Sequence, residues 1–241
     1  MTRADRQRSA HTGPLLASPA MTLRLPLFPL PGVVHFPRTE LRLHVFEPRY
    51  RQLLRDLETQ PASERWIGMV LVAPGVPQRP QPILSPGTAG RLVEVERLPD
   101  GRSNILLVGG FRFEIHTEIE GAPYRRAEVA SIHEPALDED SRALRALRAT
   151  LCETGRALQR ELGERFPVSP EHLEELADGP FEGLVNGLAA EVDLSPLQKL
   201  DLLRRGLPGR GRELHSLLRG RLQLLELLHP LRALAARPEL N

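Results

Sequence analysis

The sequence contains one cysteine, Cys152, one lysine, Lys199, and one tryptophan among its 241 residues. A single cysteine excludes an intramolecular disulfide and any zinc site that needs several cysteines. No apolar run comes near the roughly 20 residues that cross a bilayer. The apolar cluster Leu15-Leu16-Ala17 is also too short for the core of a signal peptide. We therefore expect a cytoplasmic protein without a membrane anchor.

Charge of one sign is not in excess, because 32 Lys and Arg residues stand against 31 Asp and Glu residues. The formal net charge of +1 gives no overall attraction to nucleic acid or to an anionic membrane surface. Hydrophobic residues make up 41% of the chain and charged residues 26%, which is typical of soluble globular proteins. A chain of this length can bury a substantial core in one large domain or two small ones.

Motifs for catalysis are missing as well. No glycine loop precedes Lys199, so the phosphate-binding loop of ATPases is absent. Cys152 lies in an apolar helical stripe without a neighbouring histidine, which favours a buried cysteine over a nucleophile. His44 and Glu47 form a His-x-x-Glu pair, but no second histidine stands at zinc-ligand spacing, so a structural histidine is favoured over a metal ligand. The sequence predicts no catalytic, cofactor-binding or metal-ligating residue, and hence no enzyme.

The N-terminal half has the period of β-strands. Residues 1–20 are polar and aperiodic, which predicts a disordered extension, and Met21 is a candidate for the true start. Residues 21–134 are expected to form a β domain, in which residues 41–46 alternate apolar and polar side chains. Further strands are expected at residues 66–73, 90–98, 105–108, 111–115 and 124–132. A turn at residues 99–102 predicts a hairpin, and one helix from Pro48 to about Glu58 interrupts the strands.

The C-terminal half, residues 135–237, is rich in leucine and predicts a helical bundle. Leucines lie on one helical face between Ser141 and Leu162. Ser169-Pro170 and Ser195-Pro196 each begin a helix with a cap residue and a proline at the first helical position. Two more helices are expected at residues 181–192 and at about residues 212–236.

Six arginines surround a Gly/Pro loop that is expected before the last helix. They are Arg204, Arg205, Arg210, Arg212, Arg219 and Arg221. Acidic residues are interspersed and no aromatic residue lies among them, so a solvated charged face is favoured. A phosphate-binding patch is the alternative.

One stretch carries a specific pattern. It consists of Leu25-Pro26-Leu27-Phe28-Pro29, the turn that follows, and Phe46-Glu47-Pro48-Arg49-Tyr50. Pro48 suits the first position of a helix, where a missing N–H costs nothing, and Glu47 lies beside the positive end of the helix dipole. The stretch therefore predicts a strand, a proline-punctuated turn, a second strand and the start of a helix.

This stretch closely resembles the opening of the Lon N-terminal domain family. Further matches follow in order at Ile67-Gly68, Gly87–Gly90, Asp100–Arg102, Gly110–Phe113 and Tyr124. The resemblance covers residues 22–205 and implies an α+β fold, with a PUA-like β-barrel or sandwich followed by a C-terminal α-helical bundle. In Lon this region engages protein substrates, and ATPase and Ser-Lys peptidase domains follow it. The 241 residues contain neither of these domains.

The resemblance implies a non-catalytic, stand-alone polypeptide-binding module, an adaptor or regulator in protein quality control. Its expected partners are unfolded or partly folded polypeptides and a Lon-type protease, whereas membranes and nucleic acid are not expected. Because PUA-like domains include RNA binders, RNA binding is the alternative function. Exposed apolar surface is the usual means of holding unfolded chains.

The candidate polypeptide-binding residues belong to the turn and the helix start. They are Pro31, Val33, Phe36, Arg49 and Tyr50. In the alternative interpretation, the aromatic rings of this region only close the barrel. Those rings belong to Phe28, Phe36, Phe46 and Tyr50.

Overall fold

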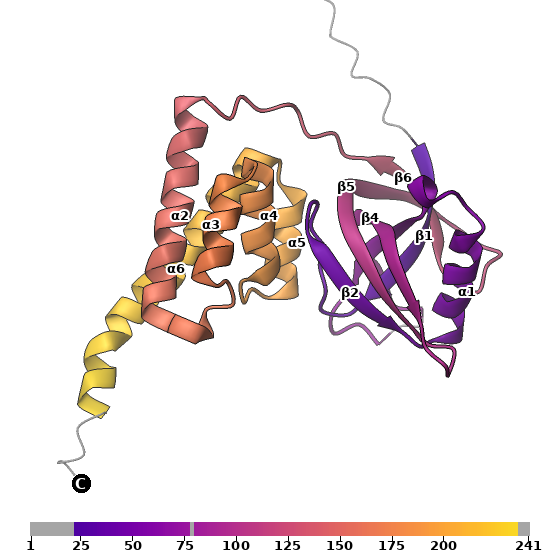
Figure 1. The fold of residues 1–241 in the computed structure, drawn as a ribbon, viewed down its shortest axis with the longest axis horizontal. Helices are drawn as coiled ribbons and strands as arrows, with labels where there is room; N and C mark the ends of the chain where they lie inside the picture. Colours follow the sequence, from indigo (N-terminus) through magenta and orange to yellow (C-terminus); the bar gives the residue numbers. More distant parts are fainter. Residues whose placement is uncertain (1–21, 78–79, 236–241) are drawn as a thin grey trace, which may run out of the picture.

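The computed structural model describes residues 22–77 and 80–235 (Figure 1). The expectations for residues 1–20, for Met21 as the start and for residues 236–237 lie outside the described residues. A six-stranded mixed sheet comes first and helices follow, so the predicted α+β class with a C-terminal helical part is confirmed. None of the described helices combines the length and the apolarity that a membrane crossing requires.

The sheet closes on itself. Its strands are β1 (Thr22–Leu30), β2 (Glu40–Val45), β3 (Trp66–Val72), β4 (Ile83–Arg97), β5 (Ser103–Ile119) and β6 (Arg126–Ser131). Their order is β2-β5-β4-β3-β1-β6, and β6 also pairs with β5, so five strands form a barrel. Strand β2 is attached to the outside of this circuit along the first part of β5.

One prediction about the strands was wrong. Residues 105–108 and 111–115 belong to a single long strand, β5, which runs straight through Gly109 and Gly110. The two glycines permit close contacts instead of making a turn. A Cβ on Gly109 would lie 2.1 Å from the carbonyl oxygen of Phe36, and one on Gly110 would lie 2.4 Å from the ring of Trp66. Glycine inside a strand often marks such a close approach.

Helix α1 (Pro48–Glu58) begins and ends as expected, with Pro48 in its first turn. Its apolar face packs against the strands of the sheet. Tyr50, Leu53 and Leu57 are buried there against residues of the strands. A short 3-10 helix, η1 (Ala62–Glu64), leads into β3.

The helical half contains α2 (Arg142–Leu162), η2 (Gly163–Arg165), α3 (Pro170–Asp178), α4 (Phe181–Glu191), α5 (Pro196–Arg204) and α6 (Leu207–Ala235). The predicted caps are present, because the side chains of Ser169 and Ser195 accept hydrogen bonds from the third residue of α3 and α5. Helix α6 begins five residues earlier than expected. Its Pro208 lies in the first turn, where proline is tolerated, and Gly211 packs against the ring of Phe181.

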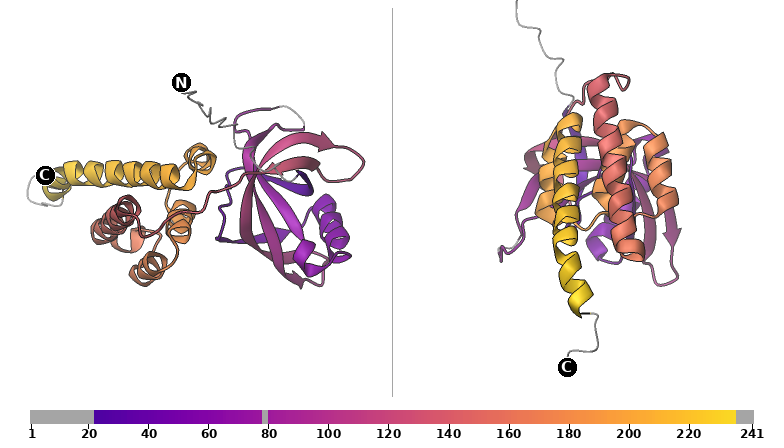
Figure 2. Two further views of the ribbon diagram at one scale, coloured as in Figure 1. Left: turned by 90° about the horizontal axis from the view of Figure 1, so that it is seen from above. Right: turned by 90° about the vertical axis from the view of Figure 1, so that its left-hand side faces the viewer.

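The barrel and the helices lie side by side, and residues 132–141 connect β6 to α2 along one edge of the molecule (Figures 1 and 2). The loop between β1 and β2 also joins the two halves. Its Phe36 is fully buried and belongs to the core of the helical half. The long helix α6 extends beyond the other helices at its C-terminal end (Figure 2).

Candidate functional site

A shallow groove lies where β1 ends and α1 begins. Its volume is about 220 Å³, and Pro31, Arg49 and Tyr50 are among the residues that line it. The groove therefore brings together three of the five residues that the sequence indicated for polypeptide binding. Glu47 and Arg125 add charged groups of both signs to its walls.

The floor of this groove is closely packed. The ring of Tyr50 stacks on Phe28 with 3.8 Å between centroids, and the guanidinium of Arg49 lies 4.6 Å from the centre of the Tyr50 ring. Arg49 also forms an ion pair with Glu47 at 2.8 Å. Burial raises the pKa of the Tyr50 phenol. Because Tyr50 is buried and Arg49 is exposed, the guanidinium is the group of this pair that faces solvent.

The five candidate residues differ in exposure. Pro31 and Arg49 are exposed and Val33 is half-buried, whereas Phe36 and Tyr50 are buried. Phe36 points away from the groove into the helical core, so it supports the loop and offers no surface of its own. The polypeptide-binding role of this region stays a prediction.

The alternative, in which four aromatic rings close the barrel, holds for only part of the set. Phe28 and Tyr50 belong to the core beneath α1. Phe36 packs among the helices instead, and Phe46 is 60% exposed. Sequence alone does not distinguish these rings, because all four stand in the same apolar stretch.

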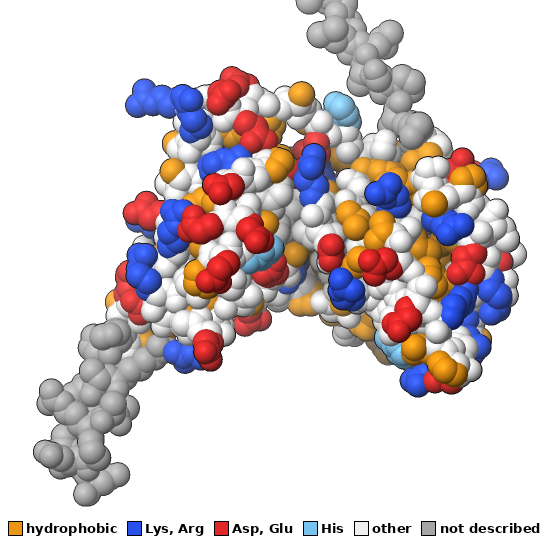
Figure 3. All heavy atoms as spheres, viewed as in Figure 1, with side chains coloured by type: hydrophobic (Ala, Val, Ile, Leu, Met, Phe, Trp, Pro, Cys, Tyr) orange, Lys and Arg blue, Asp and Glu red, His pale blue; other side chains and the backbone are white. Residues whose placement is uncertain are grey.

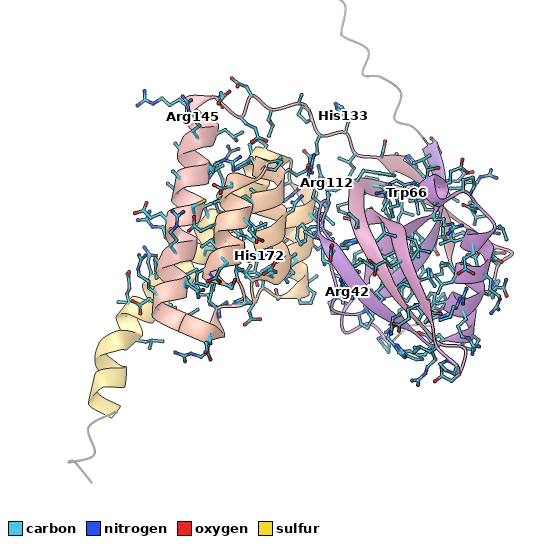
Figure 4. All side chains as sticks on the ribbon, viewed as in Figure 1. Arg42, Trp66, Arg112, His133, Arg145 and His172 are labelled. Atoms are coloured by element: carbon cyan, nitrogen blue, oxygen red, sulfur yellow. The ribbon has the colours of Figure 1, made fainter. Side chains whose placement is uncertain are left out.

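The junction between the halves contains a charged cluster that the sequence did not reveal. Arg112 on β5 and Arg210 on α6 both bind Oε1 of Glu134, at 2.5 Å and 2.7 Å. Arg210 is fully buried and Arg112 is 3% exposed. Figure 4 shows Arg112 between the barrel and the helices. Because the three residues come from the barrel, the connecting segment and α6, the cluster fixes how the two halves sit.

Neutral groups complete this junction. Arg210 donates to Oδ1 of Asn186 at 2.7 Å and to the carbonyl oxygens of Leu202 and Arg205. Asn186 in turn donates to the carbonyl oxygen of Pro37 at 3.0 Å. The loop beside Phe36 is thus tied to α4 and, through it, to α6.

The six arginines of the C-terminal half do not act as one basic patch. Four of them have carboxylate partners: Arg204 pairs with Asp201, Arg205 with Glu213, Arg210 with Glu134 and Arg221 with Asp193. The expected Gly/Pro loop is the first part of α6, and Arg210 is buried within it. On the face shown in Figure 3, blue and red side chains are interspersed over the helical half. This arrangement does not favour a phosphate-binding surface.

The other candidate groups have structural partners. Nδ1 of His44 lies 2.8 Å from Oδ1 of Asn104, and no group of three or more potential metal ligands occurs in the described ranges. Lys199 is half-buried and donates to the carbonyl oxygen of Ala190 at 2.6 Å, and burial lowers the pKa of its ammonium.

Cys152 is buried, as predicted, and burial raises the pKa of its thiol. Because the thiolate is the reactive form, we expect Cys152 to react with a thiol reagent such as Ellman's reagent much more slowly than free cysteine at pH 8. The rate measured by absorbance should rise to that of free cysteine in denaturant. Fast labelling of the native protein would contradict the buried position.

Comparisons with known proteins agree with this fold. The sequence model of the ATP-dependent protease La (LON) substrate-binding domain matches residues 24–218. The Lon protease of Flavobacterium johnsoniae is 26% identical over 210 residues, which are 86% of this chain and 25% of that protein. The Lon protease of Roseiflexus castenholzii is 27% identical over 175 residues, 71% of this chain and 21% of that protein. The chain thus spans about a quarter of the length of these relatives.

Solved structures show the same architecture. A crystal structure of a Lon N-terminal domain protein from Xanthomonas campestris has a TM-score of 0.58 at 29% identity, covering 82% of this chain and 98% of that one. The N-terminal domain of the Mycobacterium avium complex Lon protease has a TM-score of 0.59 at 17% identity, which supports the fold alone. With the family match extending from the first strand of the barrel into α6, the chain belongs to the Lon substrate-binding-domain family.

Proposed function

We propose that this chain is a non-catalytic module that holds unfolded or partly folded polypeptides and acts as an adaptor or regulator in proteolysis. The observation that carries the proposal is the match to a substrate-binding domain, which covers both the barrel and the helices. No constellation of catalytic residues in the described part of the chain competes with it. A cytoplasmic location and a Lon-type protease as partner belong to the same proposal.

The groove at the start of α1 is the proposed contact surface. It combines exposed Pro31 and the exposed guanidinium of Arg49, with the buried residue Tyr50 beneath them. Val33 lies in the adjoining turn and is half-buried, so part of its side chain is available to a bound chain. Apolar surface with charged groups at its rim suits sequence-tolerant binding of unfolded segments.

We expect Val33→Asp to weaken polypeptide binding by about tenfold, because a charge replaces apolar surface at the contact. The measurement is the fluorescence anisotropy of labelled, reduced and carboxymethylated lactalbumin, a permanently unfolded polypeptide. Leu197→Asp is the matched control, since Leu197 is 47% exposed on α5, in the helical half. An affinity of Val33→Asp equal to that of the control, with the fold intact by circular dichroism, would remove this site assignment.

The regulatory part of the proposal has a separate test. The rate at which a Lon-type protease degrades an unfolded substrate is measured with and without this chain. A change in rate at concentrations that bind the substrate supports an adaptor or regulator. An RNA oligomer titrated in parallel tests the alternative function, which requires an affinity that falls steeply as salt rises.

A further inference from the structure

Strand β2 is the open end of the sheet. It pairs with β5 through residues 40–45 and stands last in the strand order, whereas the other five strands close into a barrel. The loop that precedes it is docked on α4 by Arg38, which pairs with Glu182 at 2.6 Å. From there β2 leads away from the helices toward Phe46, whose ring is 60% exposed.

The register shows which backbone groups of β2 are free. The N–H of Gly109 donates to the carbonyl oxygen of Thr39 at 2.9 Å, so Thr39 is bonded to β5. Because bonded positions alternate along an antiparallel pair, Leu41, Leu43 and Val45 also bond to β5. The N–H and C=O groups of the residues between them point away from the barrel. These residues are Glu40, Arg42 and His44.

No backbone hydrogen bond of these three residues to any other part of the described chain is seen, and all three residues are exposed. The backbone groups of this edge therefore have no partner among the described residues. Leu41 and Leu43, which alternate with them, are only half-buried at the margin of the core beneath α1. An edge with free donors and acceptors and a partly covered apolar row is a template for one more strand.

The surface beside this edge is hollowed. A depression of about 410 Å³ lies over β2, β5 and β4, and Arg42, His44, Glu94, Glu96 and Asn104 are among the residues that line it. Its side chains stand in cross-strand rows, with His44 bonded to Asn104 and Asn104 donating to Glu96 at 2.7 Å. Figure 4 shows Arg42 on this strand. Side chains of an added strand that point to the outer face would lie beside Arg42 and His44, at the rim of this depression.

We propose that β2 binds an extended segment of a polypeptide by strand addition, with the backbone of Glu40, Arg42 and His44 as its hydrogen-bonding partner. The inference rests on the proposed polypeptide-binding function and names its mode. The bound segment alternates apolar and polar residues, because one face meets Leu41 and Leu43 and the other meets the charged rows. Main-chain bonds supply the affinity for such a segment, and the alternation of its side chains selects it from an unfolded chain.

The decisive variants are Arg42→Pro and Arg42→Ala. Proline at residue 42 removes an N–H that points away from β5 and places its ring against an incoming strand, while the bonds of β2 to β5 stay in place. Alanine removes the same side chain and keeps the N–H. We expect Arg42→Pro to weaken binding of labelled, reduced and carboxymethylated lactalbumin by at least about tenfold, and Arg42→Ala by less than about threefold.

Equal losses in both variants would overturn the proposal, because the side chain and not the backbone would then carry the binding. Unchanged binding in both would overturn strand addition while leaving the polypeptide-binding function intact. Failure of the unaltered protein to bind lactalbumin would remove the function itself. Self-association that Arg42→Pro abolishes, measured by sedimentation, would assign the edge to a second copy and overturn the polypeptide as occupant.

Hydrogen exchange provides a test that does not depend on a variant. In the unaltered protein, the amides of Arg42 and His44 should exchange fast, and saturating lactalbumin should slow them by about tenfold or more. The amides of Leu41 and Leu43, already bonded to β5, serve as the internal control. Absence of protection at Arg42 and His44 under saturating conditions would overturn the proposal.

Discussion

Arg210→Leu is expected to lower the free energy of unfolding by about 3–5 kcal/mol, because several acceptors at the junction lose their charged donor, although Glu134 keeps Arg112 as a partner. Arg210 is fully buried and binds Glu134 together with the side chain of Asn186 and two backbone carbonyl groups. Leucine fills part of the space but donates no hydrogen bond. Each acceptor left without a donor in a buried position adds to the loss.

Equilibrium unfolding in urea measures this effect with two signals. Fluorescence of Trp66 reports on the barrel, and far-ultraviolet circular dichroism reports mainly on the helices. Arg212→Leu is the matched control, because Arg212 is exposed on the same helix two residues further on, and its effect should stay within about 0.5 kcal/mol. We also expect the two signals to separate in Arg210→Leu, since the cluster joins the halves. A loss below about 1 kcal/mol would show that the junction does not depend on this arginine.

Phe36→Ala is expected to cost about 3–5 kcal/mol of unfolding free energy, as for other fully buried phenylalanines. The ring of Phe36 leaves the β1–β2 loop and packs among the helices with no exposed surface. The variant leaves a cavity at the junction and frees the loop that Asn186 holds at Pro37. The same urea titration measures the loss.

Phe46→Ala is the control for this prediction, since Phe46 is 60% exposed and should contribute within about 0.5 kcal/mol. Measurements of polypeptide binding distinguish a structural role of Phe36 from direct contact of its ring with the bound polypeptide. Under conditions in which Phe36→Ala is fully folded, its affinity for lactalbumin should fall less than that of Val33→Asp. A stability unchanged by Phe36→Ala, combined with lost binding, would instead place the ring at the contact surface.

Local patterns made much of the fold predictable. Helix α1 was expected from Pro48 to Glu58 because the proline at its start and the spacing of its apolar residues can be recognised within a short segment of sequence. The caps at Ser169 and Ser195 were predictable for the same reason. The alternation of apolar and polar residues located most strands. It cannot show whether a pair of glycines forms a turn or allows a distant residue to approach the backbone of a continuous strand. At Gly109 and Gly110 the neighbours come from distant parts of the sequence.

The site was predictable only in part. Pro31 directly follows β1, and Arg49 and Tyr50 begin α1. The segment between them, which contains β2, brings the end of β1 close to the start of α1, so the three residues line one groove. The direction of Phe36 depended on helices that begin more than 100 residues later. In the same way, Arg210 stands in sequence among arginines that pair at the surface, and only the approach of Glu134 and Asn186 distinguishes it.

By itself the sequence determined the α+β fold class, the assignment of most segments as helix or strand, and the family. Periodicity, caps and a contiguous motif are properties of neighbouring residues. The tertiary structure decided which rings are buried, which arginine joins the two halves and which strand keeps a free edge. These outcomes depend on contacts between residues far apart in the chain. Burial of a charge and closure of a barrel are settled by the partners that folding brings together.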